Sequence, residues 1–118
     1  MDIDALRYLA AEKVDTPAGN LDRASVVSPT GERLGNLDGI VIDPTERRAS
    51  FLVVSARRPL LMRRYLMPIM ASRLVQDRES VTVRVEREDL GALPEMPGGI
   101  ASFSDDDLLT AMFSERPE

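Results

Sequence analysis

The chain has 118 residues, a formal net charge of −5, no cysteine and no histidine. Its length fits one domain, which can bury roughly two thirds of the surface of the unfolded chain. The missing residue types exclude disulfides, zinc sites of the Cys/His kind, cysteine nucleophiles and every catalytic triad that needs an imidazole.

The charge falls into three blocks along the chain. Residues 1–44 carry 4 basic and 8 acidic side chains, residues 45–73 carry 7 arginines and one glutamate, and residues 74–118 carry 4 basic and 11 acidic side chains. Arginine supplies 14 of the 15 cations, which favours bidentate partners such as carboxylate or phosphate. In the simplest interpretation, the arginines of the middle block are solvated or paired with the acidic flanks.

Residues 1–20 are predicted to form an N-terminal helix followed by a linker. Apolar residues recur every three to four positions over 3–14, and Asp2 and Asp4 fall near the positive end of this helix. The stretch Thr-Pro-Ala-Gly-Asn at 16–20 then breaks the pattern. The acidic start lacks the apolar region of a signal peptide, and no apolar run approaches the roughly 20 residues of a membrane span, so a cytoplasmic location without a span is expected.

Residues 21–90 are predicted to form a small, mainly β domain, either a barrel or a sandwich. Short runs rich in β-branched residues alternate there with turn residues. The run at 49–56 is apolar on both faces, as in a strand packed on two sides, and the last run alternates valine with polar residues. The predicted strands cover 24–28, 37–43, 49–56, 63–70, 74–75 and 80–85.

Four residues are predicted to shape this domain. Gly31 follows Ser-Pro-Thr in a turn, and Gly35 indicates a bulge or a close approach of two backbones. Asp43 precedes Pro-Thr in a hairpin turn, and Pro68 indicates an edge strand or a kink. The glycines lack the Gly-Lys-Ser/Thr ending of a phosphate-binding loop, so a structural role is favoured.

Residues 91–118 are predicted to form an acidic extension that contains a short helix. Ser104 is a good N-cap for it, and the three aspartates at 105–107 suit its first turn. These aspartates do not continue as a calcium-binding EF-hand loop, which would need a glycine at the sixth position, where Thr110 stands. No catalytic residue, metal site or cofactor is predicted anywhere in the chain, and we expect no enzymatic activity.

A candidate interaction loop lies between the third and fourth predicted strands. Self-packing, with Leu60 and Met62 folded over an opening of the barrel, is one interpretation, and contact with another protein, most simply a second copy, is another. Binding to RNA or the ribosome and peripheral contact with an anionic membrane are two further alternatives. The residues of this loop are Arg57, Arg58, Leu60, Leu61, Met62, Arg63 and Arg64.

The order of these motifs resembles the PRC-barrel domain family. Residues 31–44 (GERLGNLDGIVIDP) resemble its opening turn and the apolar strand that ends in aspartate, while 49–55 and 65–69 resemble two later strands. The resemblance covers residues 22–90. It implies a small β-barrel that serves as a binding or assembly module without a catalytic site. Together with the residue pattern, this predicts a mainly β fold, a small barrel of about six short strands with short helices near both ends of the chain.

Known members of this family include a domain of the photosynthetic reaction-centre H subunit, a domain of a bacterial ribosome-maturation factor, and stand-alone bacterial proteins. The stand-alone members are the most similar in organisation. We therefore expect a non-catalytic module that acts through protein–protein contacts and forms a homodimer, with an RNA- or ribosome-associated factor as the alternative and a peripheral membrane accessory protein as the third possibility.

Overall fold

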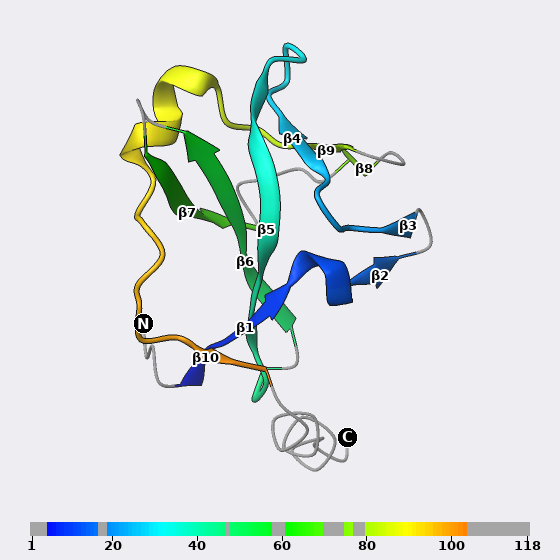
Figure 1. The fold of residues 1–118 in the computed structure, drawn as a ribbon, viewed down its shortest axis with the longest axis vertical. Helices are drawn as coiled ribbons and strands as arrows, with labels where there is room; N and C mark the ends of the chain where they lie inside the picture. Colours follow the sequence, from blue (N-terminus) through cyan, green and yellow to red (C-terminus); the bar gives the residue numbers. More distant parts are fainter. Residues whose placement is uncertain are drawn as a thin grey trace.

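The computed structural model describes residues 5–16, 19–46, 48–57, 61–69, 75–76 and 80–103. Within these ranges the fold is mainly β, as predicted, and the named helical segments, η2 and η3, are short 3₁₀ turns, drawn as coiled ribbons in Figure 1. In chain order the elements are β1 (Arg7–Ala10), η2 (Ala11–Lys13), β2 (Asp15–Thr16), β3 (Gly19–Asn20), β4 (Ser25–Val27), β5 (Arg33–Asp43), β6 (Arg48–Arg57), β7 (Met62–Pro68), β8 (Val75–Gln76), β9 (Ser80–Thr82), η3 (Arg87–Ala92) and β10 (Ala101–Ser102).

Strand β5 is the centre of the main sheet. Along one edge it pairs antiparallel with β4 near its start and with β1 near its end, while β6 pairs antiparallel along the opposite edge. Two parallel pairs, β1 with β10 and β4 with β9, extend the sheet. The order is β10-β1-β5-β4-β9-β8, with β6 and then β7 on the other side of β5. The small β2–β3 hairpin forms a second sheet.

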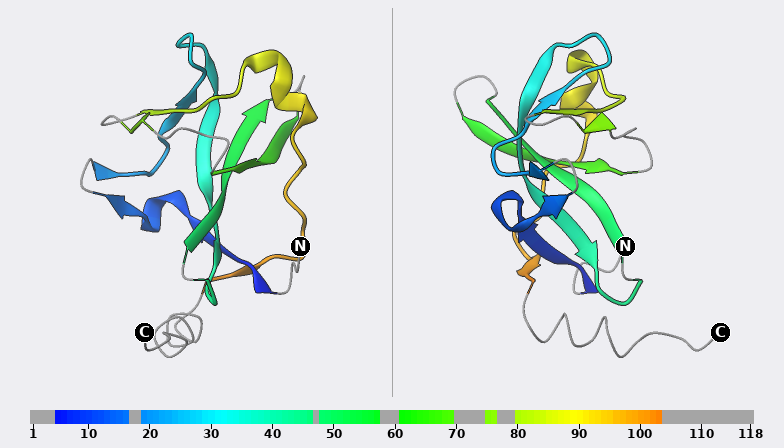
Figure 2. Two further views of the ribbon diagram at one scale, coloured as in Figure 1. Left: turned by 180° about the vertical axis from the view of Figure 1, so that it is seen from behind. Right: turned by 90° about the vertical axis from the view of Figure 1, so that its right-hand side faces the viewer.

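The closed barrel of the sequence prediction is not found in the described residues. The ladder ends at β7 on one side and at β8 on the other, and these two strands do not pair with each other. The outer edge of β7 is instead occupied by a later segment, since the Leu66 amide donates to the Pro94 carbonyl (2.8 Å) and the Met96 amide donates to the Arg64 carbonyl (2.9 Å). Figures 1 and 2 show this segment running from η3 past β7 to β10, where it lies beside β1.

The helix predicted over residues 3–14 is wrong in its described part. Arg7–Ala10 forms strand β1, and only Ala11–Lys13 is helical, as a 3₁₀ turn. Strand β1 pairs with β5 on one edge and with β10 on the other, so long-range hydrogen bonds override the local helical pattern. The C-terminal helix predicted after Ser104 lies outside the described residues.

Two clusters of buried side chains lie on opposite faces of the strands β5, β6 and β7. Strand β6 contributes to both, since Leu52 and Val54 belong to the larger cluster and Val53 to the smaller one. This is the two-sided packing that the apolar run at 49–56 predicts. The smaller cluster is completed by apolar side chains from both ends of the described chain: Leu6, Tyr8, Met96 and Ile100.

The turn residues act through local geometry. Gly31 has φ of +87°, a conformation that glycine adopts without strain, in the turn where its amide donates to the Ser28 carbonyl. The Asp43 carboxylate accepts hydrogen bonds from the amides of Thr45 and Glu46 in the β5–β6 turn. Gly35 leaves no room for a side chain on the side of β6, since a Cβ there would lie 2.3 Å from the carbonyl oxygen of Ser55. Pro68 ends β7, which has β6 as its only strand partner in the described sheet.

Candidate interaction surface at the β6–β7 hairpin

The predicted interaction loop is the tip of the β6–β7 hairpin. The two strands pair without a shift from Phe51↔Pro68 to Arg57↔Met62, so the loop is anchored by a regular ladder. Arg58 and Leu60 of the predicted set lie outside the described residues. The others are described, and the structure places them on two different hollows.

The apolar residues of the tip face solvent. The exposed fraction is 66% for Leu61 and 58% for Met62, and these are the large exposed hydrophobic residues in the described part of the chain. Self-packing of the loop would cover Leu60 and Met62; Met62 is largely exposed, and Leu60 lies outside the described residues. Two adjacent large apolar side chains are thus exposed beside the end of the β6–β7 ladder.

Arginines beside the tip pair with carboxylates from distant parts of the chain. A hydrogen-bonded ion pair joins Arg63 to Glu95 at 2.5 Å, and this contact raises the pKa of Arg63. Arg64 lies 3.6 Å from the Asp38 carboxylate. Two arginines of the basic block are thus partnered by the acidic flanks, as the simplest interpretation of the charge pattern predicts.

These side chains surround a shallow hollow of about 280 Å³. Glu95 and Met96 come from the segment that covers the edge of β7, and the remaining residues come from the hairpin. We call this the hairpin surface. Its residues are Leu61, Met62, Arg63, Arg64, Glu95 and Met96.

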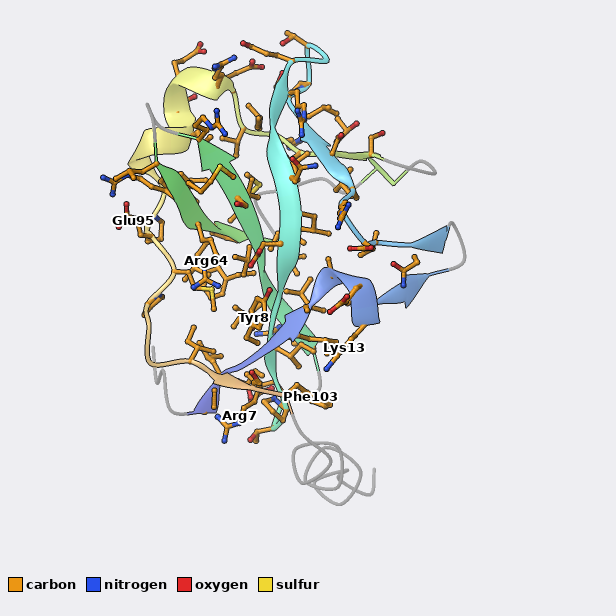
Figure 3. The ribbon with its side chains drawn as sticks, viewed as in Figure 1. Arg7, Tyr8, Lys13, Arg64, Glu95 and Phe103 are labelled. Carbon is orange, nitrogen blue, oxygen red and sulfur yellow. The ribbon has the colours of Figure 1, made fainter. Side chains whose placement is uncertain are left out.

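Tyr8, which was not among the predicted site residues, contacts Asp38 next to this surface. The hydroxyl of Tyr8 lies 2.8 Å from Oδ2 of Asp38 and 2.9 Å from its carbonyl oxygen. Burial, reinforced by the hydrogen bond to Asp38, raises the pKa of Tyr8 to about 12. Figure 3 shows Tyr8 and Arg64 approaching each other from β1 and β7, and Asp38 on β5 joins them.

The signal for this contact in the sequence is the glycine next to Asp38. A Cβ at Gly39 would lie 2.6 Å from Cε1 of Tyr8 and 2.5 Å from the carbonyl oxygen of Leu9. Only a residue without a side chain therefore lets the Tyr8 ring pack this close to β5. The contacts of Asp38 with Tyr8 and Arg64 link β1, β5 and β7, which suits a role in positioning the hairpin.

Arg57 lines a separate hollow, which it shares with residues of β5 and η3, and Met62 borders both hollows. In the described ranges, no group of three or more acidic residues is placed to hold a metal ion, and no helix is long and apolar enough to cross a membrane. A scan against protein-family models and a search of curated proteins found no match to this chain.

Proposed function

We propose that this chain is a non-catalytic binding module of the PRC-barrel type that self-associates through the hairpin surface. The observation that carries the proposal is the exposure of Leu61 and Met62 at the tip of a regular hairpin. Apolar side chains that are exposed together on a well-anchored element gain free energy when a partner covers them. The order of the motifs along the chain supports the family assignment.

A second copy is the partner that fits this surface best. The hairpin surface combines apolar side chains with cations at Arg63 and Arg64 and with an anion at Glu95. In a twofold interface each patch meets its own copy, so a surface that carries both signs of charge around an apolar centre can complement itself. Arginine and methionine are also enriched at protein interfaces.

The same geometry disfavours RNA as the partner. Tyr65 is the aromatic residue nearest the arginine pairs, but it is buried at 4% exposure and offers no face for stacking a base. Arg63 and Arg64 already lie against carboxylates, which reduces their attraction for phosphate. Peripheral membrane contact would rest on two apolar side chains, which gives weak and salt-dependent binding.

The test is the solution mass of the wild type and of the Leu61→Ser/Met62→Ser double variant, measured by light scattering after size exclusion. Burial of each side chain is worth about 1.5–3 kcal/mol, so the double variant is expected to weaken the dimer by roughly 100-fold or more. Because the contact is largely apolar, the wild-type dimer should persist at high salt. Circular dichroism should show that the variant is folded.

A matched control exchanges the two side chains without removing their apolar character. Leu61→Met/Met62→Leu should keep the dimer mass of the wild type. A wild-type monomer at high protein concentration would contradict self-association. A salt-sensitive mass excess that nuclease removes would assign the surface to nucleic acid instead.

A further inference from the structure

We infer that the hollow between β5 and β6 is a binding site for a small molecule that carries a phosphate group. This site adjoins the hairpin surface and shares Met62 with it, but its three arginines lie outside that surface, so anion binding does not require self-association. It arises where the two longest strands of the sheet stop pairing, and three arginines from separate elements line it.

The hollow results from a fork in the sheet. The pairing of β5 with β6 ends at Asn36↔Ser55. Before that point β5 follows β4, and after it β6 follows β7, so the strands diverge toward the upper end in Figure 1. The space between them has a volume of about 410 Å³, within the range of small-molecule sites. Its lining is Arg33, Leu34, Gly35, Asn36, Ser55, Ala56, Arg57, Met62 and Arg87.

The charge of this lining is unusual for an acidic protein. Arg33 begins β5, Arg57 ends β6 and Arg87 begins η3, and no carboxylate belongs to the lining. Three cations around one concave space create a positive potential that favours a multivalent anion. A carboxylate carries a single charge, whereas a phosphate monoester carries nearly two near neutral pH and matches the site more closely.

Two of the arginines are held in place by neighbours, and the third is available. Arg33 donates a hydrogen bond to the side-chain oxygen of Asn36, and Arg87 lies 3.1 Å from the carboxylate of Glu32 at the rim. Arg57 makes no ion pair or side-chain hydrogen bond with the residues that the structure describes. A ligand would therefore pair with Arg57 without displacing an existing partner and would share Arg87 with Glu32.

The remaining lining suits the rest of such a molecule. The guanidinium group binds phosphate through two parallel hydrogen bonds. Ser55 adds a hydroxyl, and Leu34, Ala56 and Met62 supply apolar contacts for an organic group. A single concave space without an exposed aromatic platform fits a compact ligand better than an extended nucleic-acid strand.

The first experiment titrates the full chain with pyrophosphate at constant ionic strength, followed by calorimetry and by amide chemical shifts. Saturable binding is expected, with the largest shifts at residues 33–36 and 55–57. Arg57→Gln is expected to reduce affinity by about tenfold or more, because it removes a charge-assisted contact. The matched controls Arg48→Gln and Arg84→Gln remove exposed arginines outside the hollow, and their affinity should stay within about twofold of the wild type.

Thermal melting of each variant establishes that it is folded. No saturable binding up to millimolar pyrophosphate would overturn the inference. An equal loss of affinity in Arg57→Gln and in the controls would also overturn it, because it would show diffuse charge attraction. Inorganic phosphate and a nucleoside monophosphate, tested in parallel, distinguish a bare anion from a phosphorylated organic ligand. Tighter binding by the bare anion than by the monophosphate would contradict the role given to the apolar wall.

The proposed anion site and the proposed self-association can be tested independently of each other. Arg33→Gln and Arg87→Gln leave the apolar tip unchanged, so they should reduce pyrophosphate binding while the solution mass stays that of the wild type. A change in mass without a change in anion affinity would overturn the inference and place these arginines in the interface.

Discussion

Replacement of Gly35 by alanine tests the close contact between β5 and β6 beside the point where the two strands stop pairing. A Cβ at this position would lie 2.3 Å from the carbonyl oxygen of Ser55 and 3.3 Å from Cβ of Ala56. Real Cβ atoms essentially never come within 3.0 Å of another heavy atom, so the oxygen has to retreat by about 0.7 Å or more. Because the obstacle is backbone, no side-chain rotation can relieve it.

The expected cost follows from two opposing effects. Overpacking of this kind costs about 1–3 kcal/mol, and a clash with backbone falls toward the upper end of that range. Alanine also lowers the entropy of the unfolded chain, which returns about 0.4–1 kcal/mol. The net loss in the free energy of unfolding should be about 2 kcal/mol, or a fall of about 8 °C or more in Tm.

Urea unfolding followed by far-ultraviolet circular dichroism measures this loss, with Gly98→Ala as the control. Nothing lies within 4 Å of a Cβ built at Gly98, and it is not among the glycines with positive φ, so its alanine variant should unfold within about 0.5 kcal/mol of the wild type. If Gly35→Ala unfolds at the same urea concentration as Gly98→Ala, the close approach does not constrain the fold and the reasoning is refuted.

Two further predictions concern Tyr8 and the β5–β6 turn. Because the pKa of Tyr8 is raised from 10.0 to about 12, its contribution to stability is present below pH 10 and is lost as the pH rises through 12. Phenolate absorbance should therefore show a step near pH 12. Tyr8→Phe should remove this step, and Asp38→Asn should move it to lower pH. Ionisation of Tyr8 near pH 10 in the wild type would disprove the prediction. Asp43→Ala removes the acceptor for the amides of Thr45 and Glu46 and should cost about 1 kcal/mol in urea unfolding, so an unchanged midpoint would show that the turn needs no cap.

Local patterns were enough to predict the middle of the fold. The run at 49–56 is apolar on both sides, and β6 indeed packs against two clusters. Turn residues such as Gly31 and Asp43 act through their own backbone and side chain, so their roles are visible without knowledge of the rest of the chain.

The same local patterns could not predict which distant strands pair with each other. Residues 7–10 have a helical spacing, but they form β1 because β5 and β10 supply hydrogen bonds from far along the sequence. The strand pattern left a barrel or a sandwich open and the family resemblance implied a barrel, whereas in the structure the segment at 94–96 occupies the edge of β7. Nothing local indicates that this irregular segment reaches that edge.

For the two hollows, too, the sequence reveals only what consecutive residues share. The apolar tip at Leu61 and Met62 is recognisable because its residues are consecutive. Arg33, Arg57 and Arg87 are brought together only by the divergence of β5 and β6 and by the position of η3. An arginine count by block places just one of the three in the basic middle of the chain, so the cluster is invisible without the fold.

The parallel pairing of β1 with β10 has a consequence for synthesis of the protein on the ribosome. Residues 7 and 8 are synthesised more than ninety residues before their partners at 101 and 102. At about 5–20 residues per second, β1 waits about 5–20 seconds for this partner. Leu6 of the smaller cluster waits about as long for Met96 and Ile100, and the later members of the cluster wait for a shorter time. Until Met96 and Ile100 have been synthesised, the apolar side chains of Leu6, Val41, Val53 and Leu66 lack part of their cover, which exposes the growing chain to chaperones and to premature contact between neighbouring copies on a polysome.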